Sequence, residues 1–348
     1  MPVTHLDEKR ARLYASDLKD MIIRMRQIIA VARATLLEGM QQPAALLLML
    51  ACVVLTGLTP IFQFHTLGEE GRMARDSGLA FMLVFGLVLA ATAASSTLTA
   101  EIESGTAAAA LSKPVPRALF LVAKFLGVFG LVTILWVAAL AATLLAERAS
   151  PHFVVLEDDV GSQRDVITTW TSLLAPVVAL ALAGLLNYLR RARFGVAAFF
   201  GVPLSLCVAL ALAGFYNRFS HFGGYQLDLN LHVPAAAVLE LLALAMFAAL
   251  AIALATRLRS GATLVVCAAL LMFGLTGDLW LGAAPALSWR GLLGGLAPNI
   301  QHFWLCDALA DGGRISWQYV GEAAAYAITW CALVLGFGTL ALRQRDLG

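Results

Sequence analysis

The chain has 348 residues, of which 60% are hydrophobic and only 13% are charged, and its mean hydropathy is +0.82. An ordinary soluble domain is about 45–50% apolar and about 25% charged, so this chain lacks the polar surface that soluble domains of its length need. The net charge of +2 is too small to indicate a nucleic-acid partner. Composition therefore predicts an integral membrane protein and argues against a secreted enzyme, a nucleic-acid-binding protein or a disordered scaffold.

The first forty residues are charged, but they carry one apolar stripe at helical spacing. Lys19, Arg26 and Arg33 recur every seven residues beside this stripe, which consists of Leu18, Ile22, Met25, Ile29, Ala32 and Leu36. A helix with an apolar face and a cationic flank suits the interface between lipid headgroups and hydrocarbon. We therefore expect residues 1–42 to be a cytoplasmic segment with an amphipathic helix that lies in the plane of the membrane.

Eight apolar stretches follow, and each is close to the roughly 20 residues that a spanning helix needs. They are Ala44–Phe64, Leu79–Leu98, Ala118–Ala146, Trp170–Asn187, Phe194–Tyr216, Pro234–Ala255, Ala262–Leu281 and Tyr319–Leu342. The predicted fold class is an all-α integral membrane protein. Residues 43–348 would form one polytopic helical bundle of about eight transmembrane helices.

The basic residues fix the expected orientation of these spans. If the N-terminus is cytoplasmic, most of the 24 Lys and Arg residues fall in the N-terminal segment, after the second, fourth and sixth spans, and after the last. Acidic residues such as Glu69, Asp76 and Asp158 gather on the opposite side. The positive-inside rule then predicts a multi-pass protein of the cell (inner) membrane with both termini in the cytoplasm.

Residues 100–117, between the second and third spans, form the most informative loop. Thr106 can cap a helix of about two turns that ends at Leu111. Pro114 and Pro116 cannot continue such a helix. We expect a short rigid element parallel to the membrane, held between two spans, on which a cytoplasmic partner can push.

A second distinctive loop lies before the last span, at residues 283–318. It contains Trp289 and Trp304 among repeated leucines. Tryptophan favours the membrane interface. We therefore expect an outer segment that is interfacial or re-entrant.

The predicted spans are almost free of ionisable residues, which mark proton relays and ion pathways when they lie within a membrane. Lys124 lies near the cytoplasmic end of the third span, where its ammonium group can snorkel to the surface. Glu240 and Glu322 lie within about two turns of the outer ends of their spans, and each is expected either to line a cavity or to be interfacial. A proton-driven carrier is hard to build from these residues.

Catalytic and metal-binding signatures are missing from the sequence. There is no phosphate loop, no H-E-x-x-H and no G-x-S-x-G, so we expect no enzymatic activity and no bound cofactor. The histidines expected outside occur singly and without ligand spacing, which predicts no metal site; they are His65, His152, His221, His232 and His302. Four of the five cysteines lie in apolar runs and are interpreted as buried thiols.

Three stretches resemble one family of membrane proteins, the type-two ABC exporter permeases. The runs Glu103-Ser-Gly-Thr106, Leu111-Ser-Lys-Pro-Val-Pro-Arg117 and Lys124-Phe-Leu-Gly127 resemble the family's loop between its second and third spans. Arg33-Ala-Thr-Leu-Leu-Glu38 resembles the end of its connector helix. Ala297-Pro-Asn-Ile-Gln-His-Phe-Trp-Leu-Cys-Asp307 resembles an outer segment that some members carry.

The resemblance implies a transmembrane permease subunit that works with two separate ABC ATPase subunits, which bind the ATP. It also implies pairing with a second permease, as a homodimer or a heterodimer. The coupling helix and its flanks would comprise Glu101, Glu103, Gly105, Thr106, Ser112, Lys113, Pro114 and Arg117. Arg26, Arg33 and Glu38 of the connector helix would form a second surface for the ATPase.

Two other functions compete with an exporter permease. The first is a non-transporting membrane anchor or maturation component that recruits a cytoplasmic partner. The second, a secondary carrier, is disfavoured by the uncharged span interiors. The sequence does not identify a substrate.

Overall fold

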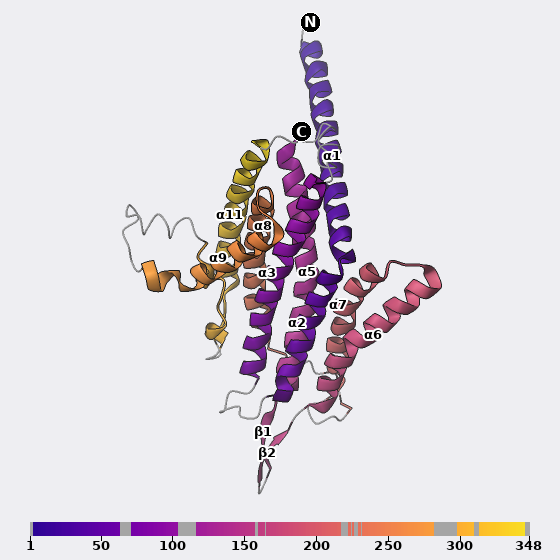
Figure 1. Ribbon diagram of the computed structural model, residues 1–348, viewed down its shortest axis with the longest axis vertical. Coiled ribbons are helices and arrows are strands. Elements are labelled where there is room, and N and C mark those ends of the chain that lie inside the picture. The colour runs from indigo at the N-terminus through magenta and orange to yellow at the C-terminus, as the bar shows by residue number, and fades with distance from the viewer. Residues whose placement is uncertain are drawn as a thin grey trace.

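The computed structural model describes residues 3–62, 71–103, 116–156, 159–163, 165–216, 222–223, 225, 229–230, 232–281, 298–309 and 313–344. Its long helices are α1 (Val3–Gln41), α2 (Pro43–Phe62), α3 (Arg72–Glu103), α5 (Arg117–Ala149), α6 (Val166–Arg190), α7 (Phe194–Ala213), α8 (Val233–Ala255), α9 (Ser260–Leu281) and α11 (Trp317–Arg343). Most of them run along one axis, as Figure 1 shows. We call the end with the N-terminus the upper end and the opposite end the lower end.

Three helices, α3, α5 and α8, make the core of the bundle. Small side chains let their backbones approach closely, as is usual where helices pack within lipid. A Cβ added at Gly86 of α3 would lie 2.6 Å from a methyl carbon of Leu244 in α8. Gly78 of α3 meets Thr143 of α5 still more closely. The core is therefore held by close contacts that any larger side chain would disturb.

Among the described residues, seven helices are long and apolar enough to cross a membrane: α2, α3, α5, α6, α7, α8 and α11. They correspond to seven of the eight predicted spans. The eighth prediction, Ala262–Leu281, falls on α9, whose described apolar part is the shorter stretch Ser260–Thr276. Figure 1 shows that α9 runs across the long axis, so here the structure differs from the predicted upright span. Hydropathy reports that a helix is apolar but does not report its tilt.

Helix α1 also differs from its prediction. We expected it to lie in the plane of the membrane, but it runs along the bundle axis beside α5, and its N-terminal half projects past the other helices (Figure 1). Only the C-terminal part of the apolar stripe packs against the bundle. Ala32 and Leu36 are partly buried, whereas Ile22, Met25 and Ile29 are exposed. Gln42 separates α1 from α2.

The lower end carries a β-hairpin that hydropathy did not predict. Strands β1 (His152–Leu156) and β2 (Asp159–Gln163) pair antiparallel, with His152 opposite Gln163 and Leu156 opposite Asp159. The hairpin joins α5 to α6 and extends away from the bundle (Figure 1). It is the only sheet among the described residues.

The described part of the segment before α11 folds back into the bundle. It contains the short 3₁₀ helices η1 (Ile300–His302) and η2 (Asp307–Leu309). Ile300, Phe303 and Cys306 are buried, and the Gln301 side chain donates a hydrogen bond to the carbonyl of Leu275 in α9. Residues 298–309 are thus inserted among the helices, while residues 282–297 lie outside the described part of the chain.

Candidate functional site

The upper end of the bundle brings together three elements that the sequence singled out: α1, the end of α3 and the start of α5. Helices α3 and α5 have 32 and 33 residues. At 1.5 Å per residue each is about 50 Å long, against about 30 Å for the hydrocarbon layer. Both core helices therefore extend beyond a bilayer, and their upper ends are joined by residues 104–115.

Helix α1 packs tightly against the upper part of α5. A Cβ added at Gly127 would lie 2.6 Å from the Cβ of Thr35 and 2.7 Å from the carbonyl oxygen of Ala32. A Cβ added at Gly39 would lie 2.8 Å from a methyl carbon of Leu131. Glycines on both helices thus permit this crossing, which ties α1 to a core helix.

The structure describes only some of the predicted coupling residues. Glu101 and Glu103 lie in the last turn of α3, where the backbone alone is described. Gly105, Thr106, Ser112, Lys113 and Pro114 lie outside the described residues, as does the predicted short helix from Thr106 to Leu111. The coupling assignment of these residues therefore stays a prediction.

Arg117, the last of the predicted coupling residues, has a visible role at the first position of α5. Its Nη1 donates to the carbonyl oxygens of Leu342, at 3.4 Å, and Arg343, at 3.1 Å, in the last turn of α11. Nη2 of Arg257, which follows α8, donates to the carbonyl of Ala341 at 2.8 Å. These carbonyls have no partner within their own helix, so two arginines from other elements cap α11. No pattern in the sequence predicted this contact, because more than 80 residues separate the two members of each pair.

The predicted contact residues of α1 lie on its surface. Arg26, Arg33 and Glu38 are all exposed. They flank the exposed apolar residues Met21, Ile22, Met25 and Ile29. These side chains of α1 are accessible, and their contact with an ATPase stays a prediction.

Lys124 is placed differently from the prediction. Its side chain is buried rather than snorkelling, with an exposed fraction of 1%. Nζ lies 3.5 Å from the carbonyl oxygen of Thr97 in α3 and 5.7 Å from the centre of the Phe120 ring. The cation therefore bridges α3 and α5 inside the protein, because α3 covers the α5 face that carries it.

Glu240 and Glu322 have opposite environments. Glu322 is exposed on α11, where it accepts a hydrogen bond from Gln318, so the structure does not place it in a cavity. Glu240 of α8 is 1% exposed. Its Oε1 lies 4.0 Å from Sγ of Cys306, in the segment that folds back into the bundle, and its Oε2 has no hydrogen-bond partner among the residues that the structure describes. The sequence left the same two outcomes open for both residues, a cavity or an interfacial position, because burial depends on which neighbour each helix face meets.

A buried polar cluster at the lower end was missed entirely by the sequence analysis. Arg148 and Asp165 pair at 3.6 Å, with each side chain 1% exposed. Arg148 also donates to the carbonyl of Tyr216, and Asp165 caps α6 by accepting from the backbone N–H of Thr168. Nearby, Arg75 of α3 pairs with Glu147 at 3.6 Å. We call Arg148, Asp165, Arg75 and Glu147 the lower clasp; it fastens α6 and α3 to the end of α5.

No group of three or more His, Cys, Asp or Glu side chains is gathered within the described part of the chain. The lower clasp therefore consists of ion pairs and hydrogen bonds and offers no cluster of metal ligands. The expectation that the protein binds neither a metal nor a cofactor remains a prediction.

These features define a polytopic α-helical membrane protein in which the core helices α3 and α5 are longer than the hydrocarbon layer is thick. The family model described as ABC-2 family transporter protein matches residues 14–347, nearly the whole chain. The chain therefore belongs to the ABC-2 transporter family, and it is a permease subunit of an ABC transporter. This confirms the resemblance seen in the sequence.

Family membership implies association with ABC ATPase subunits and with the membrane. No curated protein and no solved structure matches the chain.

Proposed function

We propose that this permease is an exporter subunit that moves its substrate when two separate ABC ATPase subunits bind and hydrolyse ATP at its upper end. The upper end would face the cytoplasm of the cell (inner) membrane, with both termini on that side. The chain itself would be neither an enzyme nor a cofactor-binding protein, because the ATP is bound by the partner. A second permease, identical or different, would complete the transporter.

The observation that carries this proposal is the connection of the core helices at the upper end. Residues 104–115 join α3 to α5, two of the three most buried spanning helices. Lys124 of α5 contacts the carbonyl of Thr97 and so joins α5 to α3. The close approach of α1 to Gly127 joins α5 to α1. Because packed interiors move as rigid units, a force on residues 104–115 or on α1 reaches the core directly.

The cationic surface of α1 and the acidic end of α3 supply charges for a partner. Arg24, Arg26 and Arg33 are exposed along α1, and Glu101 and Glu103 end α3. Charges at the rim of an interface orient the partner and exclude wrong ones. Charge reversal here should therefore weaken docking of the ATPase without disturbing the membrane-embedded core.

The test is charge reversal at the end of α3. The full chain, co-purified with its ATPase subunits and placed in lipid, is expected to support ATP hydrolysis. Glu103→Arg is expected to lower ATPase association and hydrolysis at least about tenfold, while the variant still inserts into the membrane. Glu322→Arg is the matched control, because it reverses an exposed charge near the start of α11, and it should retain both activities.

The alternative functions give different results in the same preparation. Purification from native membranes without any nucleotide-binding subunit would contradict the proposal. ATP hydrolysis with no flux of any cargo would favour a non-transporting anchor or maturation component. Transport that continues after ATP is depleted would favour the hypothesis of a secondary carrier.

A further inference from the structure

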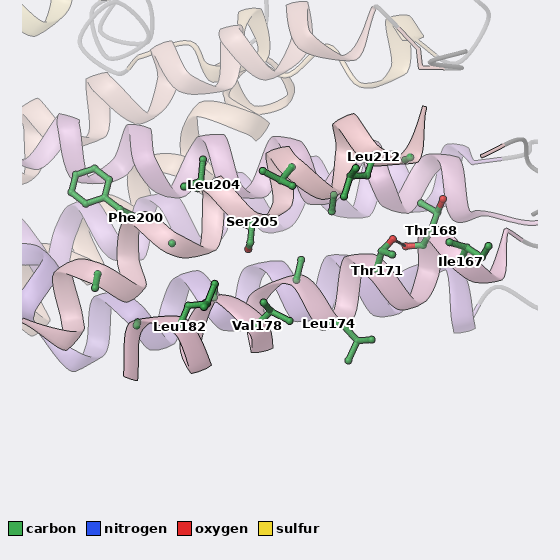
Figure 2. A pocket seen from close by; sticks show the side chains of 18 of the residues that line it. Ile167, Thr168, Thr171, Leu174, Val178, Leu182, Phe200, Leu204, Ser205 and Leu212 are labelled. Atoms are coloured by element: carbon green, nitrogen blue, oxygen red, sulfur yellow. Dashed lines mark hydrogen bonds between the residues drawn. The ribbon is translucent and has the colours of Figure 1, made fainter. Parts of the chain in front are cut away.

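Helices α6 and α7 enclose a long apolar groove on one side of the bundle. Its volume is about 630 Å³, within the range of ligand-binding sites. Figure 2 shows the lining side chains, which run from Ile167 and Thr168 at one end to Leu182 and Phe200 at the other. The groove thus follows most of the length of both helices.

The floor of the groove is made of small residues and its walls of large ones. Ala179 and Gly201 meet at the floor, where a Cβ added to Gly201 would lie 3.6 Å from the Cβ of Ala179. Large side chains such as Leu182 and Leu204 stand at the walls and are more than half exposed. This shape accommodates a narrow apolar chain between two rows of side chains.

Three hydroxyl groups in the groove already have partners. The hydroxyls of Thr171 and Ser205 donate to backbone carbonyls of their own helices, and that of Thr168 donates to Asp165. Most of the remaining lining residues are aliphatic. The chemistry of the groove therefore selects hydrocarbon.

The upper end of the groove is cationic. Arg190 follows the lining residue Leu186 by four positions on α6, and residues four apart share a helix face, so Arg190 continues the line of groove residues on that helix. Arg193 is the N-cap residue of α7, in the turn directly before the lining residue Ala197. Arg190, Arg191 and Arg193 are exposed, and within the part of the chain that the structure describes none of the three guanidinium groups has a hydrogen bond or ion pair.

The same turn also presents the start of α7. This helix of 20 residues begins after Arg193, and no side chain caps its first N–H groups. The N-terminus of a helix favours an anion through these N–H groups and the helix dipole. Asn187 fixes the turn by donating to the carbonyl of Ala192 at 2.6 Å. Arginine side chains and the N-terminus of α7 thus meet at the mouth of an apolar groove.

We propose that the α6–α7 groove binds an anionic phospholipid, with its phosphate at Arg190, Arg191 and Arg193 and one acyl chain between Leu182, Leu186, Phe200 and Leu204. This site is separate from the surface proposed for the ATPase, so neither proposal rests on the other. Arginine suits the headgroup because its planar fork matches phosphate oxygens.

A second copy of the chain fits this surface less well. In a two-fold dimer the same patch occurs on both subunits, and both copies have one orientation in the membrane. Pairing through this face would bring the two arginine turns to the same level, where they repel each other. The turn itself, residues 187–197, contains no acidic residue to balance them.

The test measures which lipids the purified full chain retains in detergent. Phosphatidylglycerol and phosphatidylcholine with the same acyl chains are offered in equal amounts, and bound lipid is quantified after gel filtration. The wild type is expected to retain the anionic lipid with at least about tenfold preference, in line with the attraction of clustered arginines to anionic headgroups. Arg190→Gln/Arg191→Gln/Arg193→Gln should bring this preference close to one.

Two matched controls accompany this test. Arg24→Gln/Arg259→Gln/Arg343→Gln removes three exposed arginines elsewhere at the upper end and should keep the preference. Gly201→Leu, which fills the groove, should reduce retention of both lipids, whereas Gly184→Leu on α6 adds a side chain in open space and should not. The charge variants keep the test decisive if Gly201→Leu fails to fold.

Three results would overturn the proposal. The first is a wild-type preference near one, and the second is an equal loss in the control with three other arginines replaced. The third is a stable dimer that Gly201→Leu dissociates while lipid retention stays unchanged. That last result would assign the groove to a second copy of the chain.

Discussion

The core helices and the α6–α7 pair are equally apolar but are used differently. In the most apolar window of each helix, 67% of α8 residues and 61% of α3 and α5 residues are buried, against 28% for α6 and 39% for α7. Lipid tails are as apolar as leucine, so apolarity alone does not drive helices together in a membrane. Burial separates the two regions: α8 contains the runs Ala235–Ala237 and Ala248–Ala249, all of them buried, whereas Leu182 and Leu204 of the α6–α7 pair are more than half exposed.

The comparison shows how a chain in lipid divides its helices. Helices that are covered by neighbours on most faces, such as α8, pack together and form a unit that can transmit force. Helices with large residues on one face keep that face for lipid or for a partner. The peripheral helices must then be attached to the core in another way, and polar contacts at their ends provide this attachment.

The largest expected effect follows from breaking the lower clasp, which joins the periphery to the core. Removing one partner of a buried ion pair typically costs about 3–5 kcal/mol. Arg148→Met should therefore destabilise the protein by about that much and release the start of α6. Thermal unfolding in detergent, with proteolysis of residues 150–170, would measure both effects.

The control for the clasp is Arg72→Met. Arg72 pairs with Asp76 at 3.4 Å, but both side chains are 30% exposed, so the loss should be about 0–1 kcal/mol. An equal loss of stability from the two substitutions would show that burial of the Arg148–Asp165 pair does not add to its contribution.

The next effect tests close packing in the core against open space at the periphery. Gly127→Leu places a side chain against Thr35 and the carbonyl of Ala32, and overpacking of this kind typically costs about 1–3 kcal/mol. Gly184→Leu in α6 meets nothing within 4 Å of its Cβ, so it should be neutral or slightly stabilising, because leucine favours helix more than glycine. The midpoint of thermal unfolding distinguishes the two variants. A larger fall in the midpoint for Gly184→Leu than for Gly127→Leu would contradict the view that the core is closely packed and the periphery open.

The smallest effect concerns α11, a second peripheral helix with 28% of its window buried. Arg117→Met removes the donor to the carbonyls of Leu342 and Arg343. A typical hydrogen bond contributes about 0.5–1.5 kcal/mol, so amide exchange in the last turn of α11 should quicken while global stability changes little. Unchanged exchange there would mean that Arg117 does not hold the helix end.

The sequence predicted the parts of the structure that hydropathy determines. The apolar runs became α2, α3, α5, α6, α7, α8 and α11, because every backbone group of a spanning helix must be satisfied within the helix. The family resemblance was also correct; it rested on the runs within residues 103–127 and, in support, on Arg33–Glu38 and Ala297–Asp307.

The remaining features depend on which faces meet, and periodicity does not encode this. Glu240 and Glu322 each lie near the outer end of a span, yet only Glu240 is buried, because Cys306 and the segment around it fold over that face of α8. Arg148 and Asp165 are 17 positions apart, and the hairpin that brings them together lies between them. Lys124 was expected to reach the surface, but α3 covers its face of α5.

The central claim is that ATP binding by the partner moves the core through residues 104–115. The most direct measurement is the distance between spin labels at Met73 of α3 and Val166 of α6, two exposed positions at the lower end, in the complex with its ATPase. The account predicts that ATP changes this distance in the wild type and leaves it unchanged in Glu103→Arg. An identical change in both proteins, or no change in a wild-type complex that hydrolyses ATP, would contradict it.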